Sequence, residues 1–90
     1  MLSTLENLIE LARERKKNPI KGSYTNKLLL DRPLGKAKVL EEINELIEAV
    51  EKNTNKVHEA ADVFYHLLIY LEANEIKIED VMSELEKREK

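Results

Sequence analysis

The stretch "EAADVFYHLLIYL", residues 59–71, decides the fold because its apolar residues are too many for one side of a helix. At about 100° per residue, one broad face holds Val57, Ala60, Ala61, Phe64, Leu67, Leu68 and Leu71, and Val63, Ile69 and Tyr70 extend it round the helix. A helix that is apolar nearly all round belongs inside a bundle. We expect it to follow the "NTN" turn at 53–55, where asparagine supplies the N-cap, and to end near residue 73.

The polar residues of this helix form a narrow strip of Glu59, Asp62 and His66. In a bundle the strip faces other protein groups or a ligand rather than open solvent. A buried carboxylate without a partner costs several kcal/mol or takes up a proton, so the two acids require a cation. Taken alone, His66 is more typical of a hydrogen-bonded core histidine, and His58 is expected at the surface.

The remaining segments also predict helices. Residues 4–17 follow a capping-box pattern of Ser3 and Glu6. The glycines and prolines all lie in 18–35, which predicts an irregular region with one short helix at 24–30. Residues 78–87 predict a last amphipathic helix, and residues 35–52 carry one apolar stripe of Val39, Ile43, Leu46, Ile47 and Val50. The fold class is therefore all-α, a bundle of four to five helices in a single domain over residues 1–90.

Size and composition limit the function classes. A chain of 90 residues buries only about 60–65% of its unfolded surface, so we expect dimerisation to complete the core. The chain has no cysteine, which excludes disulfides and thiolate metal sites. Its net charge of −3 argues against broad electrostatic binding of nucleic acid. No apolar run approaches the roughly 20 residues of a membrane span, and we expect no signal peptide and a cytoplasmic location.

A short connection between helices 35–52 and 56–73 predicts an antiparallel hairpin. The hairpin brings Glu42 and Glu45 towards Glu59 and Asp62, with Glu41 at the margin. Converging carboxylates repel unless hard cations lie between them, and Mg²⁺ or Mn²⁺ prefers all-oxygen ligation. Taken alone, Glu41, Glu48 and Glu51 are more typical of a solvated face.

The chain resembles the phosphoribosyl-ATP pyrophosphohydrolase family, within the all-α nucleotide pyrophosphohydrolase superfamily. The resemblance covers residues 5–88 and rests on "GSYTNKLL" (22–29), "KVLEEINE" (38–45), "EAADVFYHLLIYL" (59–71) and "IEDVMSELEKR" (78–88). It implies hydrolysis of phosphoribosyl-ATP to phosphoribosyl-AMP and pyrophosphate, the second step of histidine biosynthesis, with Mg²⁺ for which Mn²⁺ substitutes. It also implies a homodimer whose substrate is a small nucleotide, with no nucleic-acid or membrane partner.

The resemblance assigns roles residue by residue. It places metal ligands at Glu42, Glu45, Glu59 and Asp62, and catalytic carboxylates at Glu41, Glu42 and Glu45, with Glu41 as a ligand, a residue behind the ligands or the base. It implies substrate contacts from Ser23, Tyr24, Thr25, Lys36, Lys38, Tyr65 and His66, with Lys27 as a further candidate. Leu40 and Glu48 depart from the family pattern, and Glu48 makes a second Glu-x-x-Glu with Glu45.

Three other functions are compatible with parts of the pattern. A house-cleaning pyrophosphohydrolase of non-canonical nucleoside triphosphates uses the same acids. A di-iron carboxylate bundle requires Glu-x-x-His motifs, which this sequence lacks. A helical interaction module with solvated acids predicts no effect of metal on the melting temperature.

Overall fold

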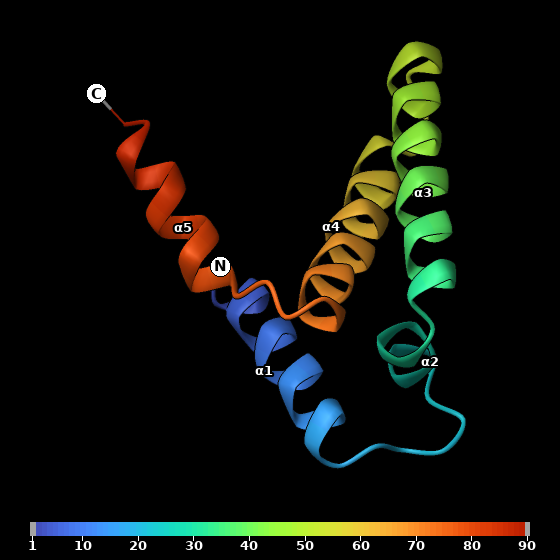
Figure 1. The fold of residues 1–90 in the computed structure, drawn as a ribbon. Coiled ribbons are helices and arrows are strands. Elements are labelled where there is room, and N and C mark those ends of the chain that lie inside the picture. Colours follow the sequence, from blue (N-terminus) through green and yellow to red (C-terminus); the bar gives the residue numbers. More distant parts are fainter. Residues whose placement is uncertain (1, 90) are drawn as a thin grey trace.

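The computed structural model describes residues 2–89, and this part of the chain consists of five α-helices without strands (Figure 1). The helices are α1 (Ser3–Lys17), α2 (Tyr24–Leu30), α3 (Arg32–Lys52), α4 (Lys56–Ala73) and α5 (Ile78–Lys87). The prediction of an all-α fold is confirmed. None of these helices is both long and apolar enough to span a lipid bilayer.

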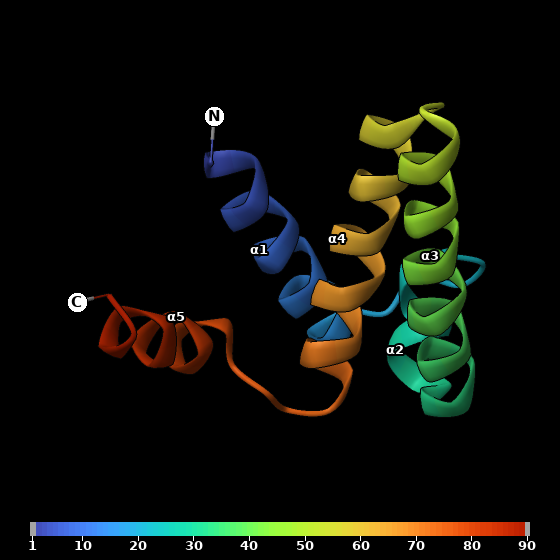
Figure 2. The same cartoon turned by 90° about the horizontal axis from the view of Figure 1, so that it is seen from above.

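Helix α4 is the centre of the fold, because it packs against all four other helices. It forms an antiparallel hairpin with α3, and α1 lies on the side of α4 away from α3 (Figures 1 and 2). Ile69 of α4 is completely buried. The core around it contains Ala12, Leu28, Leu29, Ile69 and Ala73, with Leu8, Leu34 and Tyr65 packed against them.

Two N-caps differ from the sequence prediction. Ser3 is already helical, because Leu2 before it has helical backbone angles and serves as the N-cap without a side-chain bond; the predicted capping box is wrong. Asn55 has a left-handed backbone (φ 44°), and its side chain makes no capping bond to α4. Asn53 also adopts this conformation, which asparagine tolerates better than most residues, and the two together turn the chain from α3 into α4.

Helix α3 begins three residues before the predicted residue 35. Asp31 is its N-cap, and the Oδ1 atom of Asp31 accepts a hydrogen bond from the backbone N–H of Leu34 at 3.0 Å. Pro33 lies in the first turn, where its missing N–H costs nothing. Gly35 is therefore inside the helix, and a Cβ atom there would lie 3.4 Å from Tyr70.

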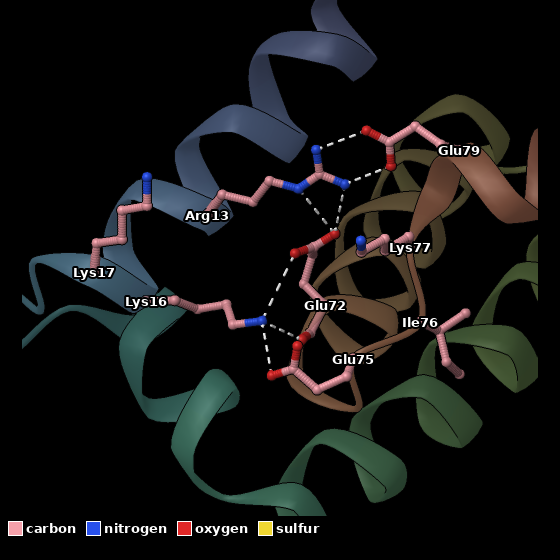
Figure 3. Close-up of a pocket in the computed structure, with 8 residues that line it drawn as sticks. All are labelled: Arg13, Lys16, Lys17, Glu72, Glu75, Ile76, Lys77 and Glu79. Carbon is pink, nitrogen blue, oxygen red and sulfur yellow. Dashed lines mark hydrogen bonds and ion pairs between the residues drawn. The ribbon is translucent and has the colours of Figure 1, made fainter.

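An ion-pair network fastens α1 and α5 to the end of α4 (Figure 3). The Arg13 guanidinium donates to both carboxylate oxygens of Glu79, at 2.7 and 2.8 Å, and to Glu72. Arg13 lowers the pKa of Glu79 to about 2. Lys16 donates to the Glu72 carbonyl at 2.8 Å and to Glu75 at 3.1 Å. Arg13 and Lys16 are thus both paired with acids, and the ion pair between Arg13 and Glu79 holds the start of α5 in place.

Large apolar side chains on both helices of the hairpin are open to solvent in the single chain. Ile47 and Val50 of α3 and Phe64 of α4 are each more than half exposed. The expectation that α4 lies inside a bundle is met only in part by a single chain, because the other helices leave this apolar side chain of α4 exposed. Helix α5 has no buried residue and projects from the body (Figures 1 and 2).

Candidate functional site

The α3–α4 hairpin brings the predicted acids together. Carboxylate oxygens of Glu42, Glu45 and Glu59 lie within 4.8 Å of one another. A second group with the same spacing consists of His58, Glu59 and Asp62. Glu59 belongs to both groups, so the two form one continuous cluster, which we call the acidic cluster: Glu42, Glu45, His58, Glu59 and Asp62.

Two oxygens of the acidic cluster are buried without a donor. Among residues 2–89, neither Oε2 of Glu42 nor Oε2 of Glu59 has a hydrogen-bond partner. Glu42 is only 6% exposed. Burial raises the pKa of both carboxyls, and the neighbouring Glu45 raises them further. The carboxylates are thus held close together at an electrostatic cost that a cation would remove.

The donor atoms of the acidic cluster fit a divalent cation. Four of its residues offer carboxylate oxygens, which are the ligands that Mg²⁺ and Mn²⁺ prefer. The orphaned buried oxygens of Glu42 and Glu59 are the structural sign that a positive group completes the cluster. The residues present therefore fit the ion that the sequence pattern implies.

Glu41 lies outside the cluster, although it is adjacent to Glu42 in sequence. Its side chain is half exposed, and one of its carboxylate oxygens accepts from Lys38 Nζ at 2.9 Å. Because Glu41 is next to the buried Glu42 in α3, this ion pair borders the acidic cluster. Lys36 is exposed and forms no ion pair within residues 2–89.

Two hydrogen-bonded pairs join the segment 23–25 to α4. The Nδ1 atom of His66 lies 2.8 Å from the carbonyl oxygen of Asp62, and its Nε2 atom lies 2.9 Å from the Tyr24 hydroxyl. A carbonyl only accepts, so Nδ1 carries the proton and Nε2 accepts from Tyr24. The hydroxyl groups of Thr25 and Tyr65 form the second hydrogen bond between the segment and α4.

His66 is buried and hydrogen-bonded, as expected for a core histidine. Its partners are Tyr24 and the backbone of Asp62. Burial raises the pKa of Tyr24, so the hydroxyl stays protonated and remains a donor at neutral pH. The rings of Tyr24 and Tyr65 stack at 6.4 Å between centroids. This contact fixes the start of α2 next to α4, the helix that carries Glu59 and Asp62.

Sequence reasoning missed two residues of this region. Arg15 Nη1 donates to the Ser23 hydroxyl at 2.8 Å, which holds the start of the 23–25 segment. The signal was the run 15–30, which has five basic residues and no acid. His58 is exposed as expected, but its Nε2 atom lies 3.3 Å from Asp62 Oδ2. Its i, i+4 spacing to Asp62 was the available signal.

Comparison with known proteins gives a consistent result. Residues 5–89 match the family described as phosphoribosyl-ATP pyrophosphohydrolase. The chain is 46% identical to the phosphoribosyl-ATP pyrophosphatase of Clostridium acetobutylicum, covering 98% of this chain and 80% of that protein. It is 42% identical to the protein of the same name from Bacillus mycoides, covering 98% of this chain and 85% of the relative.

A longer relative matches over only part of its length. The histidine biosynthesis bifunctional protein of Pyrococcus furiosus is 40% identical over 99% of this chain, and the chain spans 43% of that protein. The chain therefore corresponds to less than half of the bifunctional relative and to most of the two pyrophosphatases.

Proposed function

Because the chain belongs to the phosphoribosyl-ATP pyrophosphohydrolase family, we propose that it hydrolyses phosphoribosyl-ATP to phosphoribosyl-AMP and pyrophosphate, in histidine biosynthesis, with Mg²⁺. One observation carries this proposal: the carboxylates of Glu42, Glu45 and Glu59 converge within 4.8 Å, and two of their buried oxygens have no donor among residues 2–89. A nucleotide triphosphate brings about four further negative charges, so such a site requires a divalent cation to bind it.

In this proposal Glu42, Glu45, Glu59 and Asp62 hold the Mg²⁺, and Mn²⁺ substitutes for it. When bound, the ion neutralises phosphate charge and polarises phosphorus. The contribution of the chain is preorganisation, because the hairpin already holds three of these carboxylates together. Little side-chain ordering is then left for the moment of substrate binding.

Glu41 and Lys38 are suited to moving a proton and holding phosphate. In the free protein Lys38 is 2.9 Å from Glu41. When a polyphosphate binds, Lys38 turns to its oxygens and releases the Glu41 carboxylate. Glu41 then accepts a proton from the water that attacks phosphorus as the α–β bridging P–O bond breaks. In this assignment Glu42 and Glu45 are metal ligands, and their effect on catalysis comes through the ion.

The segment Ser23, Tyr24 and Thr25 is proposed to contact the nucleotide, with Lys36 reaching phosphate from the surface. Tyr65 and His66 act as positioning residues, since they hold the hydroxyls of Thr25 and Tyr24. The stack of Tyr24 on Tyr65 keeps the segment close to the acidic cluster. In this proposal the substrate site and the metal site lie side by side.

We also propose that two copies associate through the open apolar surface of the hairpin. Ile47, Val50 and Phe64 are all more than half exposed in the single chain. An exposed apolar surface of this kind is typical of an interaction site, and a small chain gains stability by covering it.

The test is release of pyrophosphate from phosphoribosyl-ATP and from a panel of ordinary triphosphates, with Mg²⁺ and with EDTA. We expect release only from phosphoribosyl-ATP and only with the ion. Glu42→Gln and Asp62→Asn should lose about 100-fold or more in rate, because loss of a residue that only supports a metal ligand already costs about 10–100-fold. Glu48→Gln is the matched control, because Glu48 is an exposed acid of α3 paired with Lys52 at 2.6 Å.

Three results would contradict the proposal. Parent-like turnover by both Glu42→Gln and Asp62→Asn would overturn the assignment of the site. Efficient cleavage of simple triphosphates would favour a house-cleaning pyrophosphohydrolase. Lack of turnover on every substrate, together with no effect of Mg²⁺ on melting, would favour a helical interaction module.

A further inference from the structure

The exposed histidine at the edge of the acidic cluster gives this chain a mixed nitrogen and oxygen donor set. His58 and Asp62 lie one turn apart on α4, and the Nε2 atom of His58 is 3.3 Å from Oδ2 of Asp62. Two ligands that share one ion at about 2.1 Å stand about 3.0–3.5 Å apart. The two side chains are therefore already at the separation that a shared ion requires.

The His58–Asp62 pair is continuous with the rest of the acidic cluster. Glu59 is within 4.8 Å of both His58 and Asp62 and is also part of the group with Glu42 and Glu45. Glu42 is 94% buried and belongs to that group, and its Oε2 atom has no hydrogen-bond partner among residues 2–89. An unpartnered buried oxygen in the same cluster is an independent sign of a missing cation.

We propose that His58 is a direct ligand that raises the affinity of the acidic cluster for Zn²⁺ and similar transition-metal ions relative to its affinity for Mg²⁺. The inference rests on the proposed metal site and adds a residue that lies outside the quoted family segments. Imidazole nitrogen suits Zn²⁺ and Co²⁺, whereas Mg²⁺ takes oxygen ligands and keeps several waters. His58 thus raises the affinity for transition-metal ions without raising the affinity for Mg²⁺.

The environment of His58 supports this role. Its side chain is 71% exposed, so it can turn towards an ion without disturbing the core. The other histidine of the sequence, His66, is buried with both ring nitrogens engaged, by Asp62 and Tyr24. His58 is therefore the imidazole in the described chain that is able to bind an added metal.

The experiment compares Zn²⁺ and Mg²⁺ binding to the parent and to His58→Asn by titration calorimetry at one fixed pH. We expect the affinity for Zn²⁺ to fall about 10-fold or more, since loss of a residue that only supports a ligand already costs about 10-fold, and the affinity for Mg²⁺ to stay within about 2-fold. Asp62→Asn is the matched control and should weaken binding of both ions.

A second measurement follows the ligand itself. In nitrogen NMR of the two histidines, Zn²⁺ should shift the Nε2 signal of His58 and leave that of His66 in place. Unchanged Zn²⁺ affinity in His58→Asn, or an unshifted His58 signal at saturating Zn²⁺, would overturn the inference while leaving the proposed Mg²⁺ site intact. Failure of the parent to bind either ion would instead overturn the proposed metal site and this inference with it.

Discussion

Replacing Glu42 by glutamine should stabilise the protein in the absence of metal, although it removes a proposed ligand. Glu42 is 6% exposed, its Oε2 atom has no donor within residues 2–89, and burial raises its pKa. Glutamine has nearly the same shape and removes the charge. Its amide group can donate to the carboxylates of Glu45 and Glu59, which lie within 4.8 Å.

The size of the effect follows from the cost of the unpaired group. A buried polar group without a partner costs about 1–3 kcal/mol, and proton uptake by Glu42 limits the cost towards the lower end. We expect a gain of about 1–2 kcal/mol, and each kcal/mol shifts the melting temperature of a domain of this size by about 4–8 °C. Mg²⁺ at about 100 times its dissociation constant stabilises the parent by about 2.7 kcal/mol through linkage. The order of stability should therefore reverse when Mg²⁺ replaces EDTA.

The assay is thermal unfolding of parent and Glu42→Gln by circular dichroism, in EDTA and in Mg²⁺, at one protein concentration. Glu48→Gln serves as the control and should lie slightly below the parent in both conditions, because it loses only the exposed pair with Lys52. A Glu42→Gln protein that melts at or below the parent temperature in EDTA, with its helicity intact, would show that the cluster is not under electrostatic strain.

Three further predictions concern the packing of the helices. Arg13 lowers the pKa of Glu79 to about 2 from 4.5. The stabilisation from the Arg13–Glu79 ion pair is therefore complete above pH 4.5 and is lost as the pH falls towards 2. The difference in free energy of unfolding between parent and Glu79→Gln, measured in urea, should shrink over this range. Glu75 has a left-handed backbone (φ 58°), so the free energy of unfolding measured in urea should be about 1 kcal/mol higher for Glu75→Gly than for Glu75→Ala. Equal free energies of unfolding would exclude strain at this position. Phe64 is 54% exposed, and Phe64→Asp should change the sedimentation of the proposed dimer to that of a monomer with unchanged helicity, whereas a parent that sediments as a monomer would contradict the dimer.

Most of the helix bounds could be predicted because their signals are local. The limits of α2 and α5 follow from turn residues and apolar periodicity within a few positions of each end, and both agree with the structure. The start of α3 could not, because the proline at 33 suggested a break while the cap at Asp31 places it in the first turn. The capping box predicted at Ser3 is wrong because the backbone of Leu2 is already helical. Ser3 is therefore inside the helix and cannot serve as its N-cap.

The convergence of the acids could be predicted from the sequence, but the burial of each carboxylate could not. An antiparallel hairpin of known helix lengths is enough to bring Glu42 and Glu45 towards Glu59. The i, i+3 spacing of Lys38 and Glu41 was a local signal for their pair, whereas the burial of Glu42 depends on how the helices pack. Periodicity assigns a residue to a face, whereas the burial of its carboxylate is decided by the helices packed against it.

The same hairpin explains why the site lies where it does. Helices α1 and α2 cover the C-terminal half of α4, where Leu68, Ile69 and Ala73 are buried. The N-terminal half, with Val57 and Phe64 exposed, has less cover from its own chain, and it carries Glu59 and Asp62. Closely spaced carboxylates cost less where water remains near them than inside a dry core, so the half-buried Glu59 and Asp62 cost less here than they would in the C-terminal half of α4. A second copy that covered the apolar surface beside them would lower the local dielectric constant and strengthen the attraction between the cluster and its ion.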